Sequence, residues 1–336
     1  MRIAVVGHSL IHIRQRRFFA QVAHLGHDVL VVCPNRWATL ECTRSTESGP
    51  GWSYTIEPLP APGEPDMYRF GLLGLAKALA DFHPDVVYVQ EEVGATLTRQ
   101  ALDLAKQLGA ARALFVWENQ QAPTPEQDEE LRQLDLLVCG NDAAARLHSA
   151  ADNWCVLPQV GVDTDHFQAR PDVLRSQKVV FVGRAVPEKG VEYLRSAWPT
   201  AEIAPWRDWL QLPWTLTQTQ VVVAYSQDTP QWSEQAMPYV AVEAMACGCA
   251  VVASQAGAIP WWLGGGYTGE CPGAILVPQG NTEALREAIR QAVERWEPMG
   301  QEGRGWVVQH LSSPVIARAL MEQFNLLVEV RSVQPQ

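Results

Sequence analysis

Long apolar runs and an excess of basic side chains are both missing from this chain of 336 residues. No stretch approaches the ~18 consecutive apolar residues of a membrane-spanning helix, and the apolar run within residues 1–7 is too short for the core of a signal peptide. We therefore expect a cytoplasmic protein that does not span a membrane. The formal net charge of −11 disfavours a nucleic-acid binder, because such proteins normally present a basic face.

Dinucleotide-binding and metal-binding patterns are missing as well. The first expected strand is followed by Gly7-His-Ser-Leu, which lacks the Gly-x-Gly-x-x-Gly fingerprint of a dehydrogenase. Cys247-Gly-Cys249 has no second Cys or His pair at the spacing of a zinc site. His8 and His12 lie four residues apart without a further ligand, and Asp163-Thr-Asp165 falls in the expected linker. We expect no metal.

The seven cysteines are spread through the chain, mostly within apolar runs such as Val31-Val-Cys33 and Leu137-Val-Cys139. An odd number of cysteines in a chain of this length does not suggest a disulfide framework. The pattern predicts buried free thiols in a reducing compartment.

Short β-rich apolar runs alternate with helical patterns. The expected strands cover residues 3–7, 28–33, 85–90, 113–117 and 136–140, and then 178–183, 221–225, 250–254 and 273–277. The expected helices cover residues 12–25, 70–82, 95–108 and 141–149, and then 190–197, 239–248 and 282–297. Such alternation indicates βαβ units, so we predict an α/β fold with two Rossmann-like, doubly wound parallel sheets in series.

The length favours two domains, because one hydrophobic core rarely grows to 336 residues. We place the first domain at 1–160, the second at 161–310, and a helix at 311–336 that crosses back to the first. Two such domains facing each other would hold a substrate beyond the carboxyl ends of their strands. Residues 36–66, rich in Gly, Pro and Ser, predict a long surface excursion. The stretch 191–220 is short, as if a strand and its helix were trimmed.

The expected helix at 239–248 is apolar on nearly every face and carries one carboxylate, Glu243, in its middle. A buried ionised carboxylate without partners is unfavourable, so its donors come from a ligand or from another protein group. A sugar diol is one such ligand, since two hydroxyls can donate to the two oxygens. Pro238 suits the first turn of this helix, whose N–H groups can bind a phosphate. A diphosphate and a ribose diol fit one nucleotide.

Gly183 and Arg184 end the expected strand at 178–183, and Lys189 precedes the next helix. An arginine and a lysine at a strand end beside a helix start form a cationic cradle, which can hold a diphosphate and stabilise charge on a leaving group. The alternative is ordinary surface charge. The scarcity of lysine disfavours it, because Lys189 is one of four lysines in the chain.

Together these motifs resemble the GT-B glycosyltransferases of family 4, retaining enzymes that transfer a sugar from a nucleotide donor. The matching segments cover most of 178–297 in the family's order and are residues 180–184 with 188–190, 222–226, 237–248 with 251–254, and 273–278 with Gly280. In the first half, residues 161–163 resemble the family's interdomain segment, and residues 85–92 resemble its acceptor-side strand end.

The resemblance implies that Arg184 and Lys189 hold the donor diphosphate and stabilise the leaving group without a metal, and that Glu243 binds the ribose. The residues implied in donor binding are Gly183, Gln235, Met237, Pro238, Tyr239 and Glu243. Many relatives carry a His at the acceptor-side strand end. The residues that we expect on the acceptor side of this chain are His8, His12, Gln90, Glu91, Glu92 and Asn119. For the two histidines a core or surface position is nearly as well supported.

The chain departs from the family at a functional position. The family places an acidic residue, which contacts the donor sugar, eight residues before the helix glutamate, and here that position holds Gln235. If the position is instead counted forward from Trp232, Glu234 is the acidic residue and one residue is inserted before Pro238. We favour Glu234 slightly as the third catalytic residue beside Arg184 and Lys189.

The leading hypothesis is a retaining glycosyltransferase that moves a hexose from a nucleoside-diphosphate sugar to a glycan, lipid-linked or small-molecule acceptor, as in polysaccharide biosynthesis. The alternative is a transferase-like subunit that binds a nucleotide sugar without turnover, and an epimerase on the same scaffold is a third hypothesis. Arg14, Arg16 and Arg17, beside Phe18 and Phe19, allow peripheral contact with an anionic membrane, although such clusters are usually a solvated helix face.

Overall fold

The computed structural model describes residues 1–62, 66–204 and 208–333. The chain divides into two compact units, the first made of Met1–Val160 with Ile316–Gln336 and the second of Gly161–Val315. Parts of the expected surface excursion (63–65), of the short stretch (205–207) and of the last helix (334–336) lie outside the described residues. Among the described helices, none is both long and apolar enough to cross a membrane.

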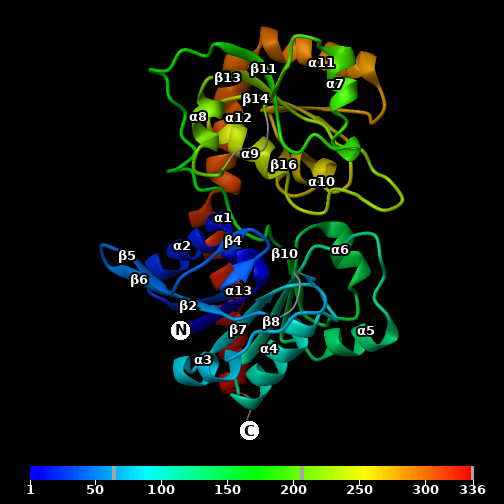
Figure 1. Ribbon diagram of the computed structural model, residues 1–336. Coiled ribbons are helices and arrows are strands. Elements are labelled where there is room, and N and C mark those ends of the chain that lie inside the picture. Colours follow the sequence, from blue (N-terminus) through cyan, green and yellow to red (C-terminus); the bar gives the residue numbers. More distant parts are fainter. Residues whose placement is uncertain (63–65, 205–207, 334–336) are drawn as a thin grey trace. The chain divides into compact units, whose positions relative to one another are not determined.

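The first unit contains an eight-stranded sheet in the order β10-β9-β8-β7-β1-β2-β6-β5 (Figure 1). Neighbouring strands are parallel except for β5, which runs antiparallel to β6. The strands are β1 (Arg2–Val6), β2 (Asp28–Pro34), β5 (Ser45–Gly49), β6 (Trp52–Leu59), β7 (Val86–Gln90), β8 (Ala111–Val116), β9 (Leu136–Cys139) and β10 (Trp154–Val156). The central strands are buried on both faces, which explains their continuous apolar sequences.

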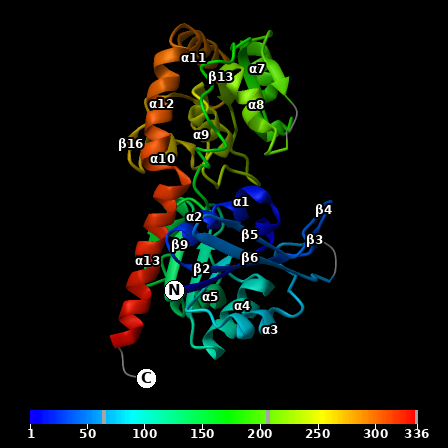
Figure 2. The same ribbon diagram turned by 90° about the vertical axis from the view of Figure 1, so that its left-hand side faces the viewer.

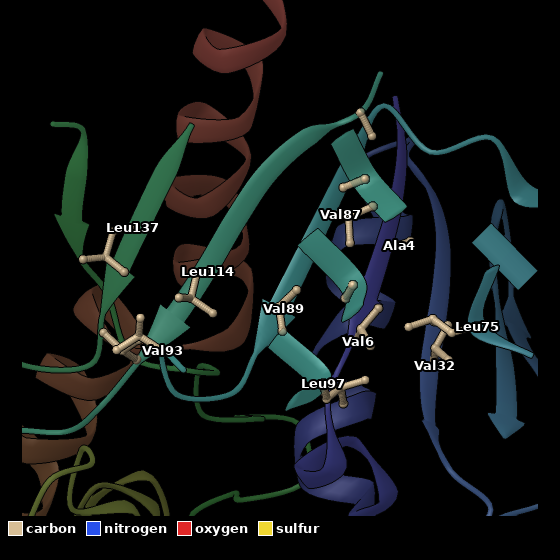
Figure 3. Packing of buried hydrophobic residues seen from close by; sticks show 14 of the residues in the cluster. Ala4, Val6, Val32, Leu75, Val87, Val89, Val93, Leu97, Leu114 and Leu137 are labelled. Atoms are coloured by element: carbon tan, nitrogen blue, oxygen red, sulfur yellow. The ribbon is translucent and has the colours of Figure 1, made fainter. Parts of the chain in front are cut away.

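Helices cover both faces of this sheet. On one face α3 (Leu75–Phe82), α4 (Thr96–Gln107), α5 (Pro125–Arg132) and α6 (Asp142–Leu147) contribute to one apolar cluster with the strands. Figure 3 shows Val6, Val89 and Leu114 on their strands within the buried cluster that also contains Leu97 of α4. The long α13 (Ser313–Val333) lies on the other face of the sheet (Figure 2), where its Phe324 ring meets Tyr88 of β7. The prediction of an α/β fold with parallel sheets is confirmed.

The segment 36–66 was wrongly predicted as a surface excursion, because it supplies two strands of the main sheet. β6 pairs with β2 in parallel register, with Val31 opposite Ile56. Tyr54 and Ile56 are buried, and their alternation with polar residues from Trp52 onward is a strand signal that the nearby Gly and Pro residues obscured. The short ribbon of β3 (Arg36–Trp37) and β4 (Leu40–Glu41) precedes them.

Two expected helices have other bounds. Residues 8–25 form η1 (His8–Ile11), α1 (Ile13–Arg17) and α2 (Phe19–His24) instead of one helix from 12 to 25. The helix expected from residue 70 begins at Leu75. Phe70 and Leu72 extended the predicted helix because they are apolar. In the structure they are buried in the apolar cluster without being helical.

The second unit contains a five-stranded parallel sheet in the order β12-β11-β13-β14-β17. Its strands are β11 (Gln177–Val182), β12 (Glu202–Ala204), β13 (Thr219–Ala224), β14 (Ala250–Ser254) and β17 (Ala274–Val277). Its helices are η2 (Pro187–Lys189), α7 (Val191–Ala197), α8 (Leu212–Thr217), α9 (Tyr239–Ala246), α10 (Ile259–Leu263), α11 (Thr282–Glu294) and α12 (Trp296–His310). A small antiparallel ribbon joins β15 (Gly264–Gly265) to β16 (Gly269–Glu270).

Helix packing in the second unit places α9 close to the sheet. α7 and α11 share one apolar cluster with the strands. α9 and α12 contact each other and the strands β13 and β14. Within the stretch 191–220, the described elements are α7, the three-residue β12, the six-residue α8 and the start of β13, and α8 contacts α9.

Candidate functional site

Each sheet has one point at which the strand order changes direction, and the expected site residues follow the strands at these points. In the first unit β1 lies between β2 and β7, and in the second β11 lies between β12 and β13. Ligands of doubly wound sheets bind beyond the carboxyl ends of the strands at such a switch point. The loops after β11 and β13, and those after β1 and β7, are therefore the places where each unit can hold a ligand.

Lys189 is the centre of a hydrogen-bonded group at the switch point of the second unit. Its Nζ atom lies 3.4 Å from Ser226 Oγ and pairs with the Glu234 carboxylate. The Ser226 hydroxyl donates to Oε1 of the same carboxylate at 2.6 Å. The ring centroid of Trp232 lies 4.7 Å from Lys189 Nζ, within the range of a cation–π contact. We call Lys189, Ser226, Trp232 and Glu234 the lysine cluster.

The lysine cluster is partly open to solvent but has a rigid base. The side chains of Lys189 and Glu234 are 21% and 17% exposed, respectively. Ser226 is buried, and its N–H donates to Ser254 Oγ at 2.7 Å while that hydroxyl donates to the Ser226 carbonyl at 2.6 Å. Because Ser254 ends β14, neighbouring strand ends fix the position of Ser226. A cation that is accessible and firmly placed suits an anionic ligand.

The loop that carries Glu234 is anchored by residues that the sequence did not reveal. The Asp228 carboxylate accepts hydrogen bonds from Ser233 Oγ at 2.7 Å, Gln279 Nε2 at 2.7 Å and the Gly257 N–H at 3.2 Å. Gly257 has a φ of +46°, and a Cβ atom there would lie 2.2 Å from the Glu234 carbonyl oxygen. Only glycine permits this approach. Asp228 and Gly257 lie in the loops that follow β13 and β14, and this position is the signal that could have found them.

The structure places Glu234 and Gln235 differently. The Glu234 carboxylate is part of the lysine cluster, and its carbonyl accepts the Ala258 N–H at 2.8 Å. Gln235 follows as a half-buried residue. The contact with Lys189 favours Glu234 as the acidic residue of the motif. Its role toward a sugar stays a prediction.

Arg184 and Gly183 follow β11 at the same sheet edge. Gly183 is buried, whereas Arg184 is exposed and forms no ion pair or hydrogen bond with any described side chain. The structure therefore places both at the switch point but does not join Arg184 to the lysine cluster. An exposed guanidinium is available to an anionic ligand there.

Glu243 is 2% exposed in the middle of α9. The indole N–H of Trp209 donates to its Oε1 atom at 3.2 Å. Trp209 in turn stacks on the His166 ring at a centroid distance of 4.0 Å, and His166 Nε2 lies 3.1 Å from the Trp209 carbonyl. The sequence left open whether a ligand or a protein group donates hydrogen bonds to Glu243, and the structure shows a protein group, Trp209. Contact with a ribose stays a prediction.

The start of α9 differs slightly from the expectation. Pro238 is the N-cap residue, directly before the first helical residue Tyr239, instead of lying within the first turn. Met237 and Pro238 are buried, and Tyr239 is half-buried. No described side chain caps this helix start. Backbone N–H groups at such a start can bind phosphate.

In the first unit His8 and Glu91 come together at the switch point. His8 Nδ1 lies 2.7 and 2.8 Å from the two Glu91 carboxylate oxygens, and the His8 N–H donates to the same side chain at 2.5 Å. Glu91 is fully buried, and the His8 ring packs against Trp37 at a centroid distance of 4.9 Å. Gly7 lets the chain after β1 lie close to the end of β7, because a Cβ atom at residue 7 would lie 2.9 Å from the Gln90 carbonyl oxygen.

Gln90 ends β7 as a fully buried residue. Its Nε2 atom donates to the Gln159 carbonyl at 3.4 Å, and its Oε1 atom accepts from Gln159 Nε2 at 3.3 Å. The same Gln159 amide donates to Ser9 Oγ at 2.9 Å. These contacts link the ends of β1 and β7 to Gln159, close to the residue at which the first segment of this unit ends. The Gln90 side chain therefore has a structural role.

Glu92 is a buried carboxyl group. It is 3% exposed, and its Oε1 atom accepts the N–H groups of Trp117 at 2.9 Å and Glu118 at 3.1 Å. Its Oε2 atom is buried without a hydrogen-bond partner among the described residues. Burial, together with the neighbouring carboxylates of Glu118 and Glu91, raises the pKa of Glu92 to about 8, although the two backbone hydrogen bonds oppose the shift.

The raised pKa predicts a pH-dependent effect of Glu92→Gln on stability. The folded state holds a proton on Glu92 that the unfolded chain releases near pH 4.5, so the parent loses stability as the pH rises from about 4.5 to about 8. The amide variant keeps an acceptor for both N–H groups but cannot ionise. Its stability relative to the parent should therefore rise by on the order of 4 kcal/mol between pH 5 and pH 9.

Thermal unfolding of both proteins across this pH range measures the effect. Glu129→Gln, on the exposed side of α5 in the same unit, is the matched control and should show no such trend. A difference between Glu92→Gln and the parent that is constant from pH 5 to pH 9 would show that Glu92 is ionised throughout.

The other expected residues of the first unit lie nearby. His12 follows η1 as an exposed residue, and Asn119 is half-buried after β8. Of the three arginines in α1, Arg16 is half-buried, donates to the Ile11 carbonyl at 2.5 Å and lies 3.8 Å from Glu47. Phe18 and Phe19 belong to the core, so they are not available to enter a membrane surface. No three His, Cys, Asp or Glu side chains of the described residues are placed to hold a metal ion.

Known proteins resemble this chain in sequence and in fold. Residues 202–295, which include β13, α9 and β14, match the family described as Glycosyl transferases group 1. No curated protein sequence matches the chain significantly. Over 98% of the chain, the structure superposes with a TM-score of 0.71 on all of the sucrose-phosphate synthase from Thermosynechococcus elongatus, at 16% identity. The chain has a glycosyltransferase fold.

Two further solved structures support this GT-B assignment. HepE from Anabaena, solved with UDP and glucose, matches 97% of this chain and 99% of its own length with a TM-score of 0.66 and 14% identity. AviGT4, a glycosyltransferase of avilamycin A biosynthesis, matches 98% of both chains with a TM-score of 0.66 and 18% identity. The group 1 segment of this glycosyltransferase fold contains Ser226, Glu234 and Glu243, while Lys189 and Arg184 precede it.

Proposed function

We propose that the protein is a retaining glycosyltransferase of the family 4 type, which moves a hexose from a nucleoside-diphosphate sugar to a glycan, lipid-linked or small-molecule acceptor. The observation that carries this proposal is the lysine cluster. It places a cation and a carboxylate side by side at the switch point of a sheet whose later part matches the group 1 family. The binding of UDP and glucose by HepE, a protein of the same fold, supports a nucleotide-sugar donor.

In this proposal the donor diphosphate lies on the cations of the second unit. Lys189 and Arg184 neutralise the charge that develops as the diphosphate departs, without a metal ion. The start of α9 offers backbone N–H groups to a phosphate, and Glu243 accepts hydrogen bonds from the ribose hydroxyls. Trp209 holds the Glu243 carboxylate in place, since it donates to one of the two oxygens.

The contacts of Glu234 support a reaction without a protein nucleophile. Its Oε1 atom already accepts hydrogen bonds from Lys189 and Ser226, which lowers the nucleophilicity of the carboxylate. Glu234 is better placed to accept hydrogen bonds from hydroxyls of the donor hexose. The acceptor then attacks from the face that the diphosphate leaves, so the configuration of the sugar is retained.

A comparison of Glu234→Ala with Gln235→Ala tests the assignment. We expect Glu234→Ala to lower kcat/KM for the donor by on the order of 100-fold, because it removes a carboxylate that contacts the sugar and orients Lys189. Gln235→Ala should leave kcat/KM within the same order of magnitude. Release of the nucleoside diphosphate measures turnover, and thermal unfolding separates lost activity from lost stability.

The opposite ranking would assign the sugar contact to Gln235. Unchanged turnover in both variants would contradict a donor site at the lysine cluster. The alternative function, a nucleotide-sugar-binding subunit, predicts instead that neither the parent nor a variant releases nucleoside diphosphate.

A further inference from the structure

A cavity of about 390 Å³ lies in the first unit between α3 and the strands β1, β2 and β6. α3 packs on β1 and on α4, and the neighbouring face of β6 is left open to this cavity. Among the described residues that line it, none comes from the loops after β1 and β7, and Arg2 is the first residue of β1. The cavity is therefore separate from the switch point, where strand order places a ligand.

Strand register explains the floor of the cavity. Leu30 of β2 lies opposite Thr55 of β6, so both side chains point to the same face of the sheet, and Leu59 follows on that face at the end of β6. Leu30 and Leu59 belong to the apolar cluster to which α3 also contributes. The floor is therefore mainly apolar, with one hydroxyl group.

One side of α3 forms the opposite wall. Residues 77, 78, 81 and 82 line the cavity, and spacings of three and four residues place them on the same side of the helix. Ala78 and Phe82 present apolar surface to the cavity, whereas Lys77 and Asp81 are exposed and form an ion pair with each other. The wall thus adds apolar contacts without an unpaired charge.

The charged groups around the cavity do not balance. Arg44 pairs with Glu57 at 2.8 Å and Lys77 pairs with Asp81, so each carboxylate of the lining already has a cation. Arg2 is the third cation of the lining, and its guanidinium forms no ion pair or hydrogen bond with any described residue. The described lining therefore carries one positive charge in excess.

Arg2 is held in place although its guanidinium lacks a counter-ion. Its N–H donates to Asp85 Oδ2 at 2.7 Å, and its carbonyl accepts the Asp85 N–H at 2.8 Å. The guanidinium lies 4.8 Å from the Phe82 ring centroid, within the range of a cation–π contact, and its Nε atom is buried. A half-buried guanidinium without an anionic partner is unfavourable, so an oxyanion in the cavity would be stabilised there.

We propose that this cavity binds a small organic anion, whose carboxylate or phosphate group pairs with Arg2 and whose apolar body lies against Leu30, Leu59 and Phe82. The volume falls within the roughly 300 to 1,000 Å³ of small-molecule sites, which combine apolar walls with a few polar groups. A neutral ligand would leave the guanidinium without a counter-ion. The site uses residues of the first unit alone, so it stands whether or not the chain transfers a sugar.

Ligand-detected NMR on the full chain, with three probes that share a phenyl ring, tests the proposal. Benzoate and phenyl phosphate carry the two kinds of oxyanion, and benzamide is the neutral counterpart of benzoate. We expect saturation transfer from the protein to at least one of the anions, and much weaker transfer to benzamide at equal concentration. The anion with the stronger transfer shows which oxyanion the cavity prefers. No transfer to either anion, or equal transfer to benzamide and to both anions, would overturn the proposal.

Variants show whether the anion binds in the cavity. Arg2→Gln removes the charge, and Ala78→Phe fills the cavity without a change in charge. Each should raise the Kd of the preferred anion, measured by NMR titration, by on the order of 10-fold or more. Arg132→Gln replaces an exposed arginine of α5 in the same unit and should bind like the parent, as should Lys189→Met in the second unit.

The variants can also contradict the proposal. An unchanged Kd in Arg2→Gln would place the anion elsewhere, and a Kd that rises only in Lys189→Met would assign it to the lysine cluster. Thermal unfolding without ligand checks that each variant is folded. If Arg2→Gln does not fold, Ala78→Phe decides, and an unchanged Kd in that variant would overturn the proposal.

Discussion

Replacing Lys189 with methionine is expected to lower kcat for the nucleotide sugar by on the order of 1,000-fold, because the variant lacks the cation that stabilises the departing diphosphate. Methionine keeps an unbranched apolar side chain next to the Trp232 ring, so the change removes charge more than packing. The reaction carries the largest charge at the diphosphate as the glycosidic bond breaks, so kcat should fall more than donor affinity. Nucleoside-diphosphate release under donor saturation measures the effect.

Lys178→Met is the matched control for this prediction. Lys178 lies on β11 in the same unit, is exposed, and has no contact with the lysine cluster among the described residues. Its replacement should leave kcat unchanged. An equal kcat for Lys189→Met and the parent would remove Lys189 from the reaction and leave its ion pair with Glu234 as a structural contact.

Replacing Glu243 with glutamine is expected to weaken the binding of the nucleoside diphosphate by on the order of 10- to 100-fold. A carboxylate accepts both ribose hydroxyls, whereas an amide offers one acceptor and turns a donor toward the second hydroxyl. Glutamine keeps an oxygen for the Trp209 indole N–H, so the fold around α9 should persist. Titration calorimetry with UDP, ADP and GDP measures affinity, and thermal unfolding without ligand checks stability.

A comparison of ribose with deoxyribose nucleotides shows whether Glu243 contacts the ribose hydroxyls directly. The parent should bind the 2′-deoxy or 3′-deoxy form of its preferred nucleoside diphosphate more weakly than the ribose form, and Glu243→Gln should largely lose this discrimination. Glu192→Gln, on α7 in the same unit, is the control and should behave like the parent. Equal discrimination in the parent and in Glu243→Gln would restrict Glu243 to its hydrogen bond with Trp209.

The sequence was sufficient to predict the parallel sheets, because their strands are short, apolar and separated by helical patterns. β7 and β14 are buried along their whole length and stand out as continuous apolar runs. β6 was missed because it lies next to a cluster of Gly and Pro residues. β12 was also missed, because three residues are too few to show the alternation of apolar and polar residues that marks a strand.

Site residues were predictable where a motif places them at a strand end or on a buried helix. Lys189 and Glu243 stand out in this way, as a scarce cation and as a charge in an apolar helix. The contacts that these and other site residues make were not predictable, because folding joins residues from separate elements. Trp209 reaches Glu243 from the short stretch, and Glu91 reaches His8 across the switch point of the first sheet. Such contacts depend on sheet order and loop geometry, which periodicity does not encode.

The central claim, that the second unit holds a nucleotide-sugar donor for transfer, is tested most directly with a panel of nucleotide sugars. Thermal stabilisation of the full chain reports binding. Release of nucleoside diphosphate in the presence of mixed glycan, lipid-linked and small-molecule acceptors reports turnover. The proposed function predicts that at least one nucleotide sugar stabilises the parent and releases its nucleoside diphosphate, and that Lys189→Met slows this release by on the order of 1,000-fold. Stabilisation without release would leave a binding subunit, and no stabilisation by any nucleotide sugar would contradict the claim.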